Sequence, residues 1–225
     1  MDFLVSDFGG AREYFDGGPG SDRWAELESV LLDLVPQFQP SDQAGKIGAP
    51  IFDPKGTNLR LTTAAAAAGW RAIPVPSSLT EFGVDWDGGK GLVLAEWQFS
   101  NYPFLWNNVI RTEAVFQSEI VLPAMDGPID ALIVVTKSGA MPASNSTLYF
   151  EQAEAQLNTV TTLGVFRLPI RLVGLTVDAS RAELELDWNQ YSGRYSRVPT
   201  ATDRRFMNVG WGRPSNYGYR PLRLT

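Results

Sequence analysis

Residues 82–99, FGVDWDGGKGLVLAEWQF, decide the fold that we predict for this chain. The segments 82–86 and 92–99 are rich in apolar, β-branched and aromatic residues, a composition typical of strands. Between them, DGGK at 87–90 is a turn signal. The sequence therefore predicts an antiparallel hairpin of two strands.

Helix and strand patterns alternate on either side of this hairpin. Apolar residues at helical spacing predict helices over about 21–35, 59–68, 104–119 and 148–161. Strand patterns occupy 131–137, 165–177 and 182–188. Strands that alternate with helices predict an α/β fold, with a central mixed β-sheet flanked by helices on both faces.

The length of the chain, 225 residues, suits one large domain or two small ones, and we predict a single domain over residues 1–225. Residues 1–20, which are glycine-rich from 9 onward, are expected to form a flexible lead-in. No apolar run approaches the roughly 18 residues of a membrane helix, and the N-terminus lacks a signal peptide. We therefore expect a cytoplasmic protein with no membrane partner.

The composition excludes several kinds of catalysis, because the chain contains neither His nor Cys. Without them it has no Ser-His-Asp triad, no imidazole base, no thiolate nucleophile and no His- or Cys-ligated zinc. If the protein is an enzyme, it works with carboxylates, amides, Lys, Arg, hydroxyls and a hard metal ion.

Charge is distributed unevenly along the chain, whose net charge is −6. The segment 189–225 has Asp203 as its single acidic residue against seven arginines: Arg194, Arg197, Arg204, Arg205, Arg213, Arg220 and Arg223. Aromatic residues interleave with these arginines, and such a mixture can grip phosphates and stack on bases. The alternative is a solvated, loop-rich tail whose aromatic residues cap the core.

Asp87, Glu96 and Gln98 form the group of polar residues that points to chemistry. Glu96 and Gln98 are two residues apart on a strand and share a face, and the hairpin brings Asp87 close to them. Two neighbouring carboxylates repel, and a divalent cation relieves that repulsion. The pattern resembles the catalytic strands of PD-(D/E)xK nucleases, with Gln98 in place of the lysine. An exposed polar strand face is the alternative.

Longer segments make the resemblance more specific. They are SDQAGKIGAPIFDPKGTN (41–58), EWQFSNYPFLWNN (96–108), PASNSTLYFEQAEAQLN (142–158), LPIRLVGL (168–175) and RYSR (194–197). Together, and in this order, they resemble the BglII-like type II restriction endonucleases of the BamHI/BglII group. The resemblance extends from about residue 22 to about residue 197.

That resemblance implies a restriction-endonuclease-like fold and a homodimer that cuts both strands of palindromic double-stranded DNA with Mg²⁺, leaving 5′-phosphates. It also implies a cognate DNA methyltransferase that acts on the same site. By position, Asp87, Glu96 and Gln98 match the catalytic residues. Asp87, Glu96 and the backbone carbonyl of Trp97 would hold the metal, and Gln98 would position the attacking water.

Base recognition is expected from short polar segments. The resemblance assigns DNA contacts to Ser100, Asn101, Asn145, Ser146, Tyr195, Ser196 and Arg197, with Arg111 as a further candidate. Asn can make two hydrogen bonds to an adenine edge, and Arg two to a guanine. Each segment could instead be a turn or helix cap, and Asn145 and Ser146 would suit the start of the helix at 148–161.

The sequence also departs from the family. Ala72 stands where the family has an Asn beside the active site, and the tail after Arg197 is different. We therefore expect a GATC-centred palindrome and leave open the outer base pairs of AGATCT. The helices at 104–119 and 148–161 are the expected dimer faces, although a monomeric core would also explain their apolar stripes. Two other functions compete: a repair or nicking nuclease of the same superfamily, and a non-catalytic acidic domain that binds carbohydrate or protein.

Overall fold

The computed structural model describes residues 1–99, 103–144, 147–193 and 195–225. Its larger sheet has six strands in the order β1-β8-β7-β6-β5-β4. In chain order they are β1 (Asp2–Phe8), β4 (Arg71–Pro74), β5 (Asp85–Lys90), β6 (Val93–Trp97), β7 (Ala131–Lys137) and β8 (Ile170–Thr176). Strands β6, β7 and β8 pair in parallel and the outer pairs are antiparallel, which confirms the predicted mixed sheet.

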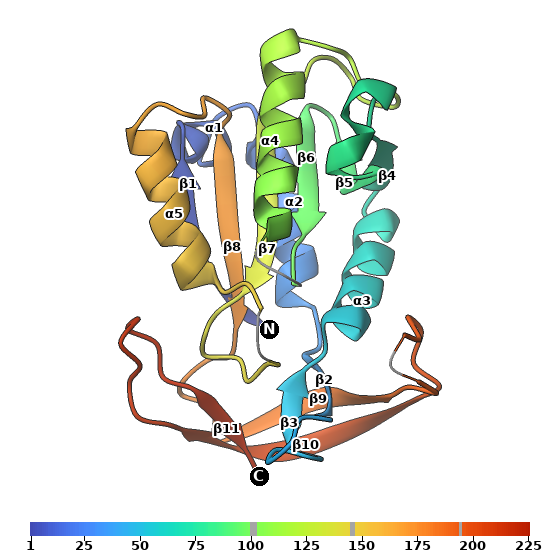
Figure 1. Cartoon of the computed structure of the whole chain (residues 1–225), viewed down its shortest axis with the longest axis vertical. Helices are drawn as coiled ribbons and strands as arrows, with labels where there is room; N and C mark the ends of the chain where they lie inside the picture. Colours follow the sequence, from blue (N-terminus) through green and yellow to red (C-terminus); the bar gives the residue numbers. More distant parts are fainter. Residues whose placement is uncertain (100–102, 145–146, 194) are drawn as a thin grey trace.

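Helices cover both faces of this sheet (Figure 1), as predicted. One face packs against α4 (Pro103–Ser118) and α5 (Phe150–Thr162). The opposite face packs against α1 (Ala11–Phe15), α2 (Ser21–Leu32) and α3 (Pro54–Ala67), and a 3₁₀ helix, η1 (Ser77–Phe82), precedes β5. Within the described ranges, no helix is long and apolar enough to cross a membrane.

The alternation of side chains along β6 feeds two cores and sets the direction of Glu96. Val93, Ala95 and Trp97 belong to the core that includes α1, α2 and α3. Leu94 belongs to the core beneath α4 and α5. Because successive side chains of a strand point to opposite faces, Glu96 lies on the face of Leu94, toward α4.

A second sheet lies beyond the carboxyl ends of β6 and β7 (Figure 1). Its strands, in the order β11-β10-β9-β2-β3, are β2 (Gln37–Pro40), β3 (Pro50–Phe52), β9 (Glu183–Gln190), β10 (Ala201–Trp211) and β11 (Leu222–Leu224). Phe38, Trp188 and Leu222 belong to the same core as Trp97 of the larger sheet. The two sheets therefore share one hydrophobic core.

The prediction of a flexible lead-in over residues 1–20 is wrong. Residues 2–8 form the edge strand β1, which pairs with β8 along its whole length, and Phe15 of α1 is 1% exposed. Arg171 on β8 fixes this segment, since it donates to both Asp7 and Asp16. Gly9 and Gly10 have positive φ, so they form the turn between β1 and α1.

The turn expected at 87–90 is also wrong, because Asp87, Gly88, Gly89 and Lys90 belong to β5. The chain turns later, at Gly91, whose φ is 63°. The glycines of β5 serve close packing, and a Cβ added to Gly89 would lie 2.3 Å from Cγ1 of Ile73 on β4. Glycines in this segment predicted a turn because glycine is flexible, whereas in β5 they are needed because glycine is small.

Most of the second sheet was not predicted. Residues 201–211, inside the segment for which a loop-rich tail was the alternative, form the longest strand of the described chain. Strand β2 has only four residues and gains its hydrogen bonds from β9 and β3. Such short strands carry little periodicity, and partners distant in the sequence decide whether they form.

We predict that Gly89→Ala lowers the free energy of unfolding by about 1–3 kcal/mol, because its methyl group overpacks the contact with Ile73. The matched control is Gly193→Ala, where an added Cβ meets nothing within 4 Å. That variant should change stability by less than about 0.5 kcal/mol. Urea denaturation measures both, and equal effects would refute the packing role of Gly89.

Candidate active site

The pairing of β5 with β6 brings the two predicted carboxylates together. Gly88 pairs with Ala95, which places Asp87 beside Glu96 on the neighbouring strand. Oδ2 of Asp87 accepts a hydrogen bond from the backbone N–H of Trp97 at 2.8 Å. The charge of Asp87 also lies close enough to Glu96 to raise the pKa of that residue. Two carboxylates this close repel each other, and a proton or a cation relieves that repulsion.

Burial governs the protonation of this pair. Glu96 is 4% exposed, and burial raises its pKa well above 4.5; Arg111 opposes this shift and Asp87 adds to it. The pKa of Asp87 is also raised by burial, against the hydrogen bond from Trp97. Two neighbouring carboxylates with raised pKa values match the site of a hard, oxygen-ligated divalent ion, because such an ion relieves the cost of their charges.

The residues present fit such an ion with few protein ligands. Nowhere in the described part of the chain do three or more acidic side chains gather as potential metal ligands. Asp87 and Glu96 would therefore need a main-chain oxygen, water or substrate oxygen to complete the coordination. This is the usual situation of Mg²⁺, which keeps several waters and binds through one or two carboxylates.

Arg111, the further candidate for a DNA contact, lies inside this site. It is 3% exposed, and its Nη2 forms an ion pair and hydrogen bond with Glu96. Nη1 donates to the Phe82 carbonyl at 3.4 Å, and the guanidinium carbon lies 4.9 Å from the Trp86 ring centre. A Cβ on Gly83 would lie 2.0 Å from Nη1, so the glycine makes room for the guanidinium.

Gln98 is held by α4, at a residue that the sequence analysis missed. Nδ2 of Asn108 donates to Oε1 of Gln98 at 3.1 Å, and both side chains are buried. Thr112 donates to the Asn108 carbonyl at 2.6 Å and accepts from Nε1 of Trp86 at 2.8 Å. Asn108 and Arg111 follow Leu105 at helical spacing, so the apolar stripe of this helix could have identified both as facing inward.

The position of Ala72 contributes no amide to this site. Ala72 lies on β4, where the register with β5 shifts between Arg71 and Ile73, and it is exposed.

The predicted base-reading residues divide into two groups. Ser100, Asn101, Asn145 and Ser146 lie outside the described residues. Tyr195, Ser196 and Arg197 lie between β9 and β10 of the second sheet, and Tyr195 is 90% exposed. Nζ of Lys55, in α3, donates to the Ser196 carbonyl at 2.8 Å, which fixes this connection against the rest of the protein.

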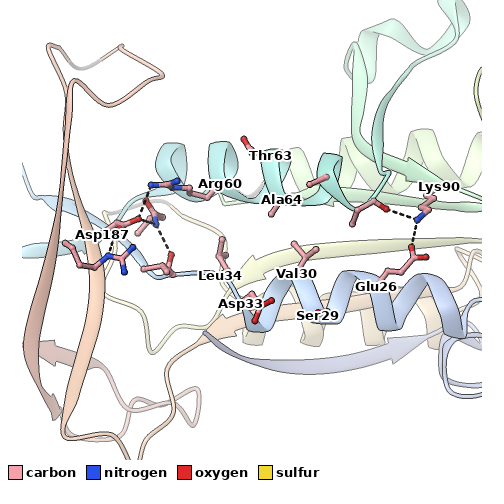
Figure 2. A pocket seen from close by; sticks show the side chains of 15 residues that line it. Glu26, Ser29, Val30, Asp33, Leu34, Arg60, Thr63, Ala64, Lys90 and Asp187 are labelled. Atoms are coloured by element: carbon pink, nitrogen blue, oxygen red, sulfur yellow. Dashed lines mark hydrogen bonds and ion pairs between the residues drawn. The ribbon is translucent and has the colours of Figure 1, made fainter.

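A groove of about 760 Å³ lies elsewhere, between α2 and α3 (Figure 2). Lys90 donates to Glu26 at one end, Arg60 pairs with Asp187 at the other, and Val30 lies between them. Neither Asp87 nor Glu96 lines this groove. Most of its charged groups already pair with one another, so we look for the chemistry at the carboxylate pair and not in the groove.

Comparisons with known proteins agree on one family. The model of a family described as restriction endonuclease BglII/BglIII matches residues 3–175. Type II restriction enzyme BglII of Bacillus subtilis is 41% identical over 182 residues, which cover 80% of each chain. The crystal structure of BglII complexed with a DNA 16-mer matches all of both chains with a TM-score of 0.89 and 36% identity. Free BglII matches 99% of this chain and 100% of its own, with a TM-score of 0.71 and 31% identity.

We predict that Arg111→Met destabilises the metal-free protein by roughly 3–5 kcal/mol at pH 8, because it leaves Glu96 buried without its cation. Because the folded-state pKa of Glu96 is raised, the protein loses stability as pH rises past 4.5, and this loss should continue to higher pH in the variant, where Arg111 no longer lowers that pKa. At pH 5, where Glu96 holds a proton, the effect should be smaller.

The matched control is Arg23→Met, which removes a partly exposed partner of Glu26 and should cost at most about 1 kcal/mol. Urea denaturation at both pH values measures these effects. The same loss for Arg111→Met at pH 5 and pH 8 would show that Arg111 only fills space.

Proposed function

The chain belongs to the BglII/BglIII family of restriction endonucleases and is a site-specific type II endonuclease, and we propose that it cuts a GATC-centred palindrome with Mg²⁺, leaving 5′-phosphates. The observation that carries this proposal is the buried carboxylate pair. Asp87 and Glu96 lie side by side on adjacent strands and have raised pKa values. A repair or nicking nuclease would use the same pair, so the products of DNA cleavage must decide between them.

Asp87, Glu96 and the backbone carbonyl of Trp97 are the proposed metal ligands. Bound there, Mg²⁺ would supply a Lewis acid for the scissile phosphate and a water of lowered pKa. A cation held there would reduce the repulsion between the Asp87 and Glu96 carboxylates, whose pKa values are raised. Arg111 then keeps Glu96 oriented and partly neutralised.

Gln98 is proposed to orient the attacking water. Its amide does not titrate near neutral pH, so it cannot act as a general base. The bond from Asn108 to its Oε1 fixes the plane of the amide, and β7 fixes its backbone, because Gln98 N–H donates to the Val135 carbonyl at 2.8 Å. A fixed amide can hold a water in line for attack, which is the kind of preorganisation that lowers a barrier.

A homodimer is proposed because a palindrome is read by a two-fold symmetric protein. Exposed Phe104 and Ile110 on α4, and Leu163 just after α5, support the helices predicted as dimer faces. The structure of BglII with a DNA 16-mer supports duplex DNA as the partner. The base contacts assigned to Ser100, Asn101, Asn145, Ser146, Tyr195, Ser196 and Arg197 are part of this proposal.

The remaining expectations belong to the same proposal. One endonuclease domain over residues 1–225 is supported by the core that joins the two sheets. A methyltransferase acting on the same site would protect host DNA, and both enzymes would meet that DNA in the cytoplasm. The arginine-rich segment 189–225 would face DNA with only part of its charge, because Arg204 pairs with Asp187 and Glu185 and Arg205 lies 3.7 Å from Asp203.

We predict that Asp87→Asn and Glu96→Gln each lower the rate of DNA cleavage by at least about 100-fold, the scale of losing one key electrostatic stabiliser. DNA binding should survive. The matched control is Asp85→Asn, two residues earlier on β5 and exposed, which should cut at nearly the parent rate. Digestion of phage DNA with Mg²⁺ and sequencing of the fragment ends gives rate, site and cut position together.

Discrete fragments identify a restriction enzyme, and nicks alone a repair or nicking enzyme. DNA that stays intact with every divalent ion tested would overturn the nuclease proposal. A parent rate for either active-site variant would overturn the metal assignment.

We predict that Asn145→Ala or Arg197→Ala lowers discrimination by roughly 1–3 kcal/mol per base pair contacted, because each removes hydrogen bonds to a base edge. Cleavage rates on the intact site and on sites with one changed base pair measure this. Weaker binding to all sequences alike would reassign that residue to a phosphate contact.

A further inference from the structure

Lys137, the last residue of β7, is 0% exposed, although lysine is among the residues least often buried. Its Nζ is surrounded by neutral oxygens. It donates to the Leu148 carbonyl at 2.8 Å and to Oγ1 of Thr147, and it lies 3.5 Å from the Phe99 carbonyl. One amine therefore joins three parts of the chain.

These parts meet at one end of the larger sheet. Phe99 follows β6, Lys137 ends β7, and Thr147 and Leu148 precede α5. Strands β6 and β7 are parallel, so their carboxyl ends lie side by side and face the second sheet (Figure 1). Thr147 adds a direct link, since its hydroxyl also donates to the Phe99 carbonyl at 3.2 Å.

The surroundings of Lys137 are costly for a charge. Burial lowers its pKa to about 7, and Glu151 of α5 opposes that shift. Glu151 is itself engaged, because it accepts from the Ser138 hydroxyl at 2.7 Å and the Gly139 N–H at 2.8 Å. The rings of Tyr149 and Phe52 lie 5.0 and 5.7 Å from Nζ. A methionine would fill this space without the cost of burying an amine. The hydrogen bonds that Nζ of Lys137 makes are therefore what distinguishes the lysine from an apolar side chain here.

We propose that Lys137 is a positioning residue that locks the two segments carrying the proposed base-reading residues to the catalytic strand, and so sets sequence discrimination. Phe99 directly precedes Ser100 and directly follows Gln98, while Thr147 directly follows Ser146. An amine that ties Phe99 to Thr147 and Leu148 fixes the spacing between these segments at their roots. The inference rests on the proposed function and extends it to a residue that touches neither DNA nor metal.

Protonation does not abolish this role. The ammonium can donate to all three oxygens, whereas the neutral amine donates two hydrogen bonds and can accept one from the Thr147 hydroxyl. The role therefore depends on where Nζ lies, and the shape of the side chain and the presence of its nitrogen are what an experiment should vary.

The first test compares Lys137→Met with Lys90→Met. Lys90 ends β5 as Lys137 ends β7, and its Nζ donates to Glu26 and to the Ala68 carbonyl, beside the groove between α2 and α3 (Figure 2). Cleavage rates are measured on the intact site and on sites with one changed base pair. We expect the ratio of these rates to fall at least about tenfold in Lys137→Met and to stay within about twofold in Lys90→Met.

Chemical rescue separates positioning from general stability. The chain contains no Cys, so Lys137→Cys carries a single thiol that can be aminoethylated in the unfolded state before refolding. This restores an amine at the length of lysine. The aminoethylated protein should regain the parent discrimination, whereas the untreated cysteine variant should not. Parent protein taken through the same treatment controls for refolding.

The outcomes distinguish the two proposals. Parent protein that makes no discrete cuts with Mg²⁺ would overturn the proposed function. Parent protein that cuts at one site, with unchanged discrimination in Lys137→Met or an equal loss in Lys90→Met, would overturn the role of Lys137 alone. If Lys137→Met does not fold, the test uses Thr147→Val, which removes the second link to Phe99. We expect this variant also to lower the ratio of cleavage rates on the intact and changed sites. A parent-like ratio in Thr147→Val would refute the inference.

Discussion

The burial of two like charges side by side is the constraint on which the rest of the structure depends. Asp87 and Glu96 lie on adjacent strands, and burial raises the pKa of both. Such a pair is stable only with a proton, a cation or compensating donors. The chain supplies one stabilising group for each carboxylate, the N–H of Trp97 for Asp87 and the guanidinium of Arg111 for Glu96. The proposed metal would add the remaining positive charge.

Much of the surrounding structure positions the groups that stabilise the two carboxylates. Helix α4 covers the face of β6 on which Glu96 lies, and its inner side carries both Arg111 and Asn108. Glycines make room where backbone and side chains come closest, at Gly83 against Arg111 and at Gly89 against Ile73. The site therefore needs residues that are small or polar at positions where a simple core would be apolar, which is common where function overrides local preference.

Local sequence patterns predict some of the strands of this protein and miss others, most of them in the second sheet. The central strands and long helices were predicted because their apolar residues repeat over many positions, as along β7 and α4. The edge strand β1 and the short strands β2, β3 and β11 have no such signal. They form because distant partners complete their hydrogen bonds and because Arg171 and the shared core hold them.

The sequence by itself pointed to the proposed chemistry: it has no His or Cys, Glu96 and Gln98 lie at strand spacing near Asp87, and several segments resemble one family. It also determined the mixed sheet between two layers of helices, since residue periodicity records which faces are buried. Only the tertiary structure decided that Arg111 pairs with Glu96 and that Lys137 joins the ends of three segments. Those facts depend on how α4 and α5 pack across the sheet, and long-range packing leaves no local pattern in the chain.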